Sequence, residues 1–434
     1  MNFKLNTPTK PGTAARTKES PAVNFASHPT KRTSNTPDTG PAGDRGPAAP
    51  RRGFDDDEFA SRLARAQRLM AMAGVDALFL TTEPEFRYFT GFFTQFWQSP
   101  TRPWFLIVPR EGKPIAVIPE IGAPLLATTW IKDIRTWTSP RPEDEGVSLL
   151  ADTLHSVLGS KSRVGVPMGP ETTLRMPLKD YVQLISLAPG IEFVDATDVI
   201  KNLRMVKSET EIEKIAHICR IASDAFDRVP EIVSAGQPLS EAFRAFKIEL
   251  LTLGADDVPY LVGASDPGGY DNVISPPDNR PLCSGDVLML DTGAVYDGYF
   301  CDFDRNYAIG AADDDARRGY DTLFRATDAA FNVARPGASS ADLFRAMQTV
   351  IMDDGYACGN VGRLGHGLGM QLTEWPSHTA EDHTVLVPGM VLTLEPGLWL
   401  GPGRSMVHEE NLVIREGGAE LLSRRASADL PEIR

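Results

Sequence analysis

The stretch from Leu288 to Tyr307, LMLDTGAVYDGYFCDFDRNY, constrains the fold of this chain more than any other. An apolar run that includes residues 287–290 ends directly in Asp291, and a second segment after a glycine-containing turn carries Asp302 and Asp304. A buried carboxylate is costly unless it is paired or bound to a metal. The pattern predicts a β-hairpin whose spacing can bring Asp291 and Asp302 to one point. Because Asp-Gly and Asp-x-Gly are also ordinary turn sequences, two turn aspartates are the alternative.

Later segments supply more side chains of the same chemistry. His366 lies between glycines, where the backbone can come close and a ring nitrogen stays accessible, and Glu395 ends another apolar run. A Glu-Glu pair at 409–410 adjoins a further strand-like run, and Asp304 would share a strand face with Asp302. One histidine with four or five carboxylates suits a pair of divalent ions such as Fe, Mn, Co or Zn.

Composition sets the broad class of the protein. The chain has 434 residues, of which 42% are hydrophobic and 24% charged, as expected for an ordinary globular protein of two or three domains. A net charge of −14 argues against nucleic-acid and anionic-membrane partners. No window approaches the roughly 18 apolar residues of a membrane span. The four cysteines form no C-x-x-C pair and indicate reduced thiols. We therefore expect a cytoplasmic protein.

The chain divides into three parts by composition. Residues 1–53 form a Pro-rich N-terminal arm with few large apolar residues. Such a segment cannot order itself alone, so a disordered tail is predicted, and an arm that wraps a partner subunit is the alternative. Residues 54–200 alternate helical and strand patterns, which is typical of an α/β domain. Residues 201–434 form a second domain, in which 259–282 is rich in Gly, Pro and Asp and is predicted to be irregular.

Local patterns predict several individual elements. A helix is expected over 55–73, ended by Gly74, and a second helix starts at the capping box formed by Ser208 and Glu211. Further helices are expected over about 240–253, 313–334 and 340–354, and strands over 76–80, 104–109 and 114–119.

Taken in order, D-x(10)-D, G-H-G-x-G, E-P-G and E-[DE] resemble the methionine aminopeptidase, prolidase and creatinase superfamily, over about residues 200–425. The resemblance implies an α+β fold, with a C-terminal pita-bread catalytic domain after a smaller α/β creatinase-like N-terminal domain. It also implies a metal-ligand set, in which Glu409 is preferred to Glu410 because Gly418 follows it by nine residues. The implied ligands are Asp291, Asp302, His366, Glu395 and Glu409.

The sequence departs from the peptidases of that superfamily at two positions. They place a histidine seventeen residues before the first Asp ligand and another seven residues after the metal His. Ile274 and Thr373 occupy these positions here. Because those histidines bind and polarise the tetrahedral intermediate, their loss predicts poor amide hydrolysis. The family's usual Thr two residues after the second Asp is here Asp304.

This combination, with the N-terminal arm and the aromatic segment 86–104, resembles the dimethylsulfoniopropionate lyases of this fold. The resemblance implies a homodimeric carbon–sulfur lyase with two divalent ions, iron favoured, that releases dimethyl sulfide and acrylate by proton abstraction and β-elimination. Asp304 is the expected base, with Glu374 and His408 as alternates. A hydrolase of the Xaa-Pro dipeptidase or creatinase kind is the alternative, and a binding protein that has lost catalysis is a third possibility.

The substrate of such a lyase is a small zwitterionic sulfonium, whose cation favours aromatic faces and carboxylates. Trp97 and Trp399 are the preferred contacts, because both lie in segments that are typical of surface loops. Packing in the core or at an interface is the alternative for each aromatic residue. The candidates are Tyr88, Trp97, Trp104, Tyr260, Tyr270, Trp375 and Trp399.

Overall fold

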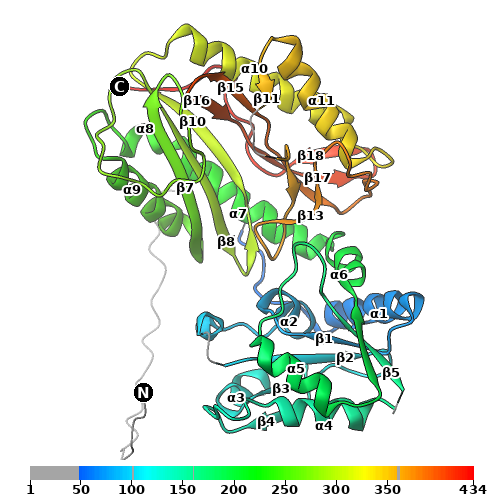
Figure 1. Ribbon diagram of the computed structural model, residues 1–434. Coiled ribbons are helices and arrows are strands. Elements are labelled where there is room, and N and C mark those ends of the chain that lie inside the picture. The colour runs from blue at the N-terminus through cyan, green and yellow to red at the C-terminus, as the bar shows by residue number, and fades with distance from the viewer. Residues whose placement is uncertain (1–47, 100–101, 160, 359–361) are drawn as a thin grey trace, which may run out of the picture. The chain divides into compact units, whose positions relative to one another are not determined.

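The computed structural model describes residues 48–99, 102–159, 161–358 and 362–434 (Figure 1). Most of the predicted arm, residues 1–47, therefore lies outside the described residues. Its last residues are held in place, because Arg52 forms two hydrogen bonds to Asp256, of 2.5 and 2.6 Å. The backbone N–H of Gly53 also donates to Asp297 at 2.8 Å. Residues 49–434 form one compact unit, and the domain boundary predicted at residue 200 stays a prediction.

The N-terminal part of this unit is built on one mixed sheet. Among the described residues it has six strands, in the order β4-β3-β2-β1-β5-β6. The pairs β1–β2 and β2–β3 are antiparallel, whereas β3–β4, β1–β5 and β5–β6 are parallel. The elements are α1 (Asp56–Ala73), β1 (Ala77–Leu80), α2 (Glu83–Thr90), β2 (Phe105–Pro109), β3 (Ile115–Pro119), α3 (Ala123–Leu126), β4 (Asp133–Trp137), α4 (Val147–Val157), β5 (Ser162–Val166), α5 (Leu178–Leu187), β6 (Ile191–Asp195) and α6 (Thr197–Arg204).

The first helix follows the sequence pattern closely. Its buried residues include Phe59, Leu63, Ala66 and Met70, which recur at the helical period. Gly74 ends it in the left-handed conformation, with φ of 65°, as predicted.

Among the described residues, the C-terminal part carries three sheets and the helices α7 to α11. Its elements are α7 (Glu209–Asp227), α8 (Val229–Ile232), α9 (Leu239–Leu253), β7 (Asp257–Pro267), β8 (Asp286–Tyr296), β9 (Tyr299–Phe300), β10 (Phe303–Ile309), α10 (Asp314–Val333), α11 (Ser340–Asp353), β11 (Ala357–Cys358), β12 (His366–Gly367), β13 (Glu374–Ser377), β14 (Val391–Leu394), β15 (Gly397–Gly401), β16 (Arg404–Val407), β17 (Glu410–Arg415), β18 (Gly418–Leu421) and β19 (Glu432–Ile433). The described strands pair in the orders β19-β10-β8-β7, β13-β12-β14-β17-β18 and β11-β15-β16.

Strand β8 explains why the sequence before Asp291 is apolar without alternation. Leu288 and Leu290 belong to the core that includes α7 and α9, whereas Val287 and Met289 belong to a second core with α10 and α11. Both faces of the strand are thus buried, so both need apolar side chains. Asp291 lies on the same face of β8 as Val287 and Met289. The core on that face also contains residues of β14.

The prediction that 259–282 is irregular was wrong for its first third. Strand β7 extends to Pro267 and pairs antiparallel with β8 along most of its length. It is an edge strand of its sheet, where a missing N–H is tolerated, so its prolines do not prevent pairing. Among the described residues, no helix has both the length and the apolar character that a bilayer crossing requires.

The capping box at the start of α7 is present as predicted. The N–H of Ser208 donates to the Glu211 carboxylate at 2.9 Å, and the N–H of Glu211 donates to the Ser208 hydroxyl at 3.4 Å. Ser208→Ala should therefore lower the free energy of unfolding by about 1 kcal/mol. Urea denaturation followed by circular dichroism measures it. Ser61→Ala on the exposed side of α1 is the control, and an equal loss in both variants would refute the capping contribution.

Candidate metal centre

The β8–β10 hairpin brings three aspartates together. Asp291 lies directly opposite Asp304 in the antiparallel register, and Asp302 comes just before β10 begins. Asn411 of β17 holds the backbone of Asp302 from both sides. Its Oδ1 accepts the N–H of Asp302 at 2.9 Å, and its Nδ2 donates to the carbonyl oxygen of Asp302. The position of Asp302 thus depends on a strand more than a hundred residues away in the sequence.

His366 presents a free lone pair to two of the carboxylates. Its Nδ1 lies 2.8 Å from the carbonyl oxygen of Gly367, and since a carbonyl only accepts, Nδ1 carries the proton. Its Nε2 then faces Asp302 Oδ2 at 3.4 Å and Glu395 Oε1 at 3.8 Å. Burial lowers the pKa of His366 to about 3, so the ring is neutral at pH 7.

The glycines around His366 are required by close approach of the backbone. Gly365 has φ of 136°, in a region that other residues rarely adopt. A Cβ at Gly367 would stand 2.0 Å from the carbonyl oxygen of Trp375 in the neighbouring segment. The sequence pattern correctly indicated a close backbone contact at this histidine.

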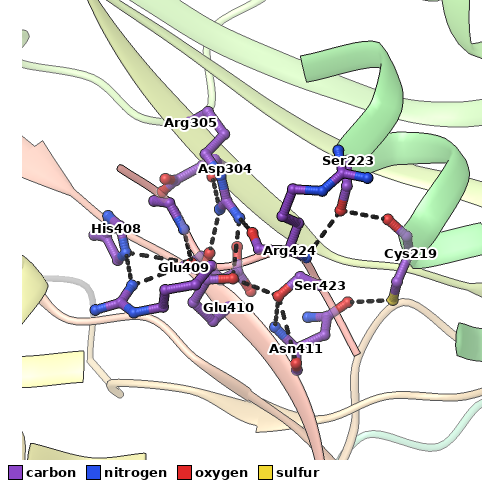
Figure 2. A network of polar contacts seen from close by, with 12 residues as sticks. Cys219, Ser223, Asp304, Arg305, His408, Glu409, Glu410, Asn411, Ser423 and Arg424 are labelled. Carbon is purple, nitrogen blue, oxygen red and sulfur yellow. Dashed lines mark hydrogen bonds and ion pairs between the residues drawn. The ribbon is translucent and has the colours of Figure 1, made fainter. Parts of the chain in front are cut away.

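Two consecutive glutamates at the start of β17, Glu409 just before the strand and Glu410 as its first residue, have opposite surroundings. Glu410 pairs with Arg305 at 3.0 Å and with Arg425 at 3.1 Å, in the network of Figure 2. Burial alone would favour the neutral acid, but Arg305 and further partners lower the pKa of Glu410 below its ordinary range. Glu409 is also buried, and its Oε1 has no hydrogen-bond partner among the described residues. Burial, followed by repulsion from Asp302, raises the pKa of Glu409 well above its ordinary value.

The other carboxylates are similarly short of partners. The Oδ1 atoms of Asp291 and Asp304 are buried without a hydrogen bond in the described part of the chain. Burial raises the pKa of Asp291 to about 7 and that of Glu395 to about 8. Burial and then the Asp291 carboxylate raise the pKa values of Asp302 and Asp304 well above the ordinary range.

A divalent cation fits this arrangement. Asp302, His366 and Glu409 each offer one ligand atom, and these atoms lie within 4.8 Å of one another. All three are buried, and each is an acceptor that gains from a positive charge between them. The oxygen-rich donor set with one neutral imidazole is the kind that binds first-row divalent ions. The residues present therefore fit a metal ion.

Three residues that the sequence patterns did not single out support the centre. Asn411 holds Asp302, as described above. The buried His378 contacts the Ser340 hydroxyl at 2.7 Å through Nδ1 and the Thr393 carbonyl at 3.0 Å through Nε2. Arg363 lies 3.8 Å from Glu395 Oε1 and donates to the Thr373 hydroxyl at 3.2 Å. Their signal in the sequence is only proximity to the motifs, because each acts through contacts that the fold creates.

The predicted bases other than Asp304 are engaged elsewhere. Glu374 is buried between Arg204 and Lys207, and the Lys207 Nζ lies 3.0 Å from its Oε2. Although burial opposes ionisation, these cations lower the pKa of Glu374 to about 2. His408 is fully buried in the network of Figure 2, with Nε2 2.7 Å from the Arg425 guanidinium.

Four of the seven aromatic candidates for substrate binding, Tyr88, Trp97, Tyr260 and Trp399, lie in different surroundings. Tyr260 lies at the centre, where its hydroxyl donates to Asp291 at 3.2 Å. Trp97 is in a short 3-10 helix and is buried against Phe86 and Trp104, and Tyr88 is 1% exposed. Trp399 is 37% exposed on strand β15. The prediction that Trp97 and Trp399 lie in surface loops was wrong. Trp97 lies in a buried 3-10 helix and Trp399 in strand β15, because aromatic side chains near glycines also suit buried turns and strands.

The buried neutral histidine gives a pH-dependent stability. Burial lowers the pKa of His378 from 6.5 to about 4, so between these values the unfolded chain binds a proton that the folded chain does not. The free energy of unfolding should therefore fall as the pH falls from 6.5 to 4, by up to about 3 kcal/mol from this residue. His378→Gln should give a shallower slope in urea titrations across this range. His383→Gln, at an exposed position, is the control, and an unchanged slope in His378→Gln would contradict the assignment.

Comparison with known proteins covers most of the described chain. The model of metallopeptidase family M24 matches residues 213–416, and that of the creatinase/prolidase N-terminal domain matches residues 62–206. The chain is 32% identical over 374 residues to the probable dipeptidase PepE of Mycobacterium tuberculosis, which covers 85% of this chain and 95% of that protein. It is 31% identical over 243 residues to the Xaa-Pro dipeptidase of Pyrococcus furiosus, covering 54% and 67% of the two.

Solved structures agree with this picture. The dipeptidase PepE from Mycobacterium ulcerans superposes with a TM-score of 0.76 at 29% identity, over 88% of this chain and 99% of that one. The prolidase from Thermococcus sibiricus, at 24% identity and a TM-score of 0.77, has the same fold. The expected architecture of a creatinase-like domain followed by a pita-bread domain is confirmed.

The expectation of a carbon–sulfur lyase acting on dimethylsulfoniopropionate was wrong. The two PepE proteins and the Pyrococcus furiosus enzyme, which the chain matches over much of its length, are named as dipeptidases. The sulfonium substrate is therefore wrong as well. The assignment of Asp304, Glu374 or His408 as a catalytic residue stays a prediction. The loss of two histidines is weaker evidence about the reaction than similarity along the whole chain. The protein belongs to metallopeptidase family M24 and carries the creatinase/prolidase N-terminal domain.

Proposed function

We propose that this protein is a metal-dependent hydrolase that cleaves the C–N bond of dipeptides. The observation that carries the proposal is the set of acceptors around His366 Nε2, in which Asp302 Oδ2 and Glu395 Oε1 face the ring and the buried Asp302, His366 and Glu409 offer ligand atoms within 4.8 Å of one another. Dipeptides are favoured as substrates because the relatives named as dipeptidases match this chain over much of its length.

We assign the metal ligands as in the resemblance to the family. Asp291, Asp302, His366, Glu395 and Glu409 would hold two divalent ions, with Mn, Fe, Co and Zn all compatible with this donor set. Ions at such a site polarise a carbonyl oxygen and lower the pKa of water. The Tyr260 hydroxyl keeps Asp291 oriented, and the two hydrogen bonds of Asn411 keep Asp302 in place. The homodimer expected from the sequence also remains a prediction.

Arg363 supplies the positive charge that the missing histidines supply in other members. Its guanidinium reaches both Glu395 and Thr373, the residue at the position of the second histidine. A guanidinium at this point can hold a substrate oxygen that gains negative charge, and it needs no particular pH to stay charged. Ile274, at the position of the first histidine, is 69% exposed and cannot take such a role because it is apolar.

The metal site can be tested without any assay of activity. Asp302→Ala and His366→Ala should each lose most of the bound divalent metal, because each removes a ligand from the buried group. Plasma mass spectrometry of dialysed protein measures the metal per chain. Asp152→Ala, on the exposed side of α4, is the matched control and should keep the metal content of the wild type. Full metal content in both ligand variants would refute the assigned site.

The reaction can be tested on a panel of dipeptides, including Xaa-Pro sequences, with amino-acid release measured by chromatography. The wild type should release amino acids, and Asp302→Ala and His366→Ala should lose at least about a hundredfold in kcat/KM. Arg363→Met should lower kcat/KM by about tenfold or more while keeping the metal. Metal-loaded wild-type protein that hydrolyses no dipeptide would overturn the proposed function.

A further inference from the structure

A cavity of about 620 Å³ is lined by residues other than the assigned metal ligands, so metal binding does not explain it. It is bounded by helix α2 and the segment after it on one side, and by β7, β9 and residues 370–373 on the other. Its volume is within the range of small-molecule sites. The lining residues that matter below are Glu83, Arg87, Phe93, Asp257, Leu372 and Thr373.

Two contacts connect this cavity to the centre. Thr373 in its wall accepts a hydrogen bond from Arg363, whose Nε lies 3.8 Å from Glu395 Oε1. Pro259, also in the wall, directly precedes Tyr260, whose hydroxyl donates to Asp291. Residues of the wall thus contact residues of the centre, and we infer that a substrate whose reacting bond lies at the centre extends a side chain into the cavity.

The cations and anions of the lining are not balanced. Arg87 pairs with Asp297 at 3.0 Å, which also pairs with Lys214 at 2.7 Å, and Asp256 pairs with Arg52 at 2.5 Å. By contrast, the Glu83 carboxylate forms no hydrogen bond or ion pair with any residue that the structure describes. Burial raises the pKa of Glu83, and the more distant Arg87 and Arg175 only partly oppose it.

Asp257 adds a second negative charge to the lining. Its carboxylate accepts the N–H of Val258 and has no ion-pair partner within the described ranges. The lining as a whole, with Glu83, Asp256 and Asp257 against Arg87, has a net charge of −2. A positively charged ligand would balance it.

The rest of the wall is apolar. Phe93 is 51% exposed, and Phe300, Met370 and Leu372 also line the space. A ligand that matches such a wall has an aliphatic stem that covers the apolar surface and a cation that reaches the carboxylates. The side chains of arginine and lysine have this form.

We propose that this cavity selects dipeptides with a basic side chain, arginine or lysine, and that Glu83 pairs with the terminal cation. The inference rests on the proposed function and names the substrate class of the same site. It makes Glu83 a specificity-determining residue, which acts on the choice of substrate rather than on the reacting bond.

Arginine and citrulline provide the sharpest comparison, because their side chains are nearly isosteric and differ in charge. Dipeptides that carry either residue at the first or the second position are compared by kcat/KM. The wild type should prefer an arginine dipeptide by about tenfold at one of these positions, and Glu83→Gln should reduce the ratio to nearly one. Glu111→Gln, an exposed glutamate in the same part of the chain, should keep the wild-type ratio.

Agmatine, a guanidinium on a four-carbon stem, tests the cavity without hydrolysis. Calorimetry should detect its binding to wild type and Glu111→Gln, with at least about fivefold weaker binding to Glu83→Gln. Because agmatine also carries an amino group, the matched control is N-carbamoylputrescine, in which a neutral urea replaces the guanidinium and which should bind the wild type at least about fivefold more weakly. Equal rates on arginine and citrulline dipeptides would overturn the inference and leave the dipeptidase standing. If no dipeptide is hydrolysed, the proposed function fails. Agmatine binding that depends on Glu83 then supports a basic-ligand cavity, and its absence overturns that as well.

Discussion

The centre of this protein is organised by repulsion between buried acceptors. Asp302, Glu395 and the lone pair of His366 point at one another, and Glu409 lies close enough to share a ligand sphere with Asp302 and His366. Asp302, His366 and Glu409 are buried, so little water screens them, and a positive ion or extra protons must balance the charge. The surrounding strands are held by enough apolar burial and hydrogen bonding to keep these groups together despite their mutual repulsion.

The same residue types nearby have a different role because they have partners. Glu410 follows Glu409 directly, yet Arg305 and Arg425 neutralise it, and together they fix β17 against its neighbours. Glu374 is likewise held between Arg204 and Lys207. A buried carboxylate with fixed cations stabilises the structure around it, whereas one without them is free to bind a metal. Whether a buried carboxylate has a structural or a metal-binding role thus depends more on its charged partners than on its residue type.

The identity of single motif residues was a poor guide to the reaction. Ile274 and Thr373 replace two histidines, and this favoured a chemistry without amide hydrolysis. The structure brings Arg363 to Thr373 and Glu395, so a positive charge is still present beside the centre. A catalytic charge can come from any residue that the fold delivers to the right point, because electrostatic stabilisation depends on position and not on sequence order.

The sequence by itself determined the elements and much of the ligand chemistry. The run before Asp291, the glycines around His366 and the capping box at Ser208 act locally, through strand burial, backbone clearance and helix ends, so they are readable from short patterns. Tertiary structure decided which side chains meet. Asn411 reaches Asp302, Arg363 reaches Thr373, and Glu83 is left without a cation only because distant strands and helices pack together. Such pairings depend on contacts across the chain, and no local pattern encodes them.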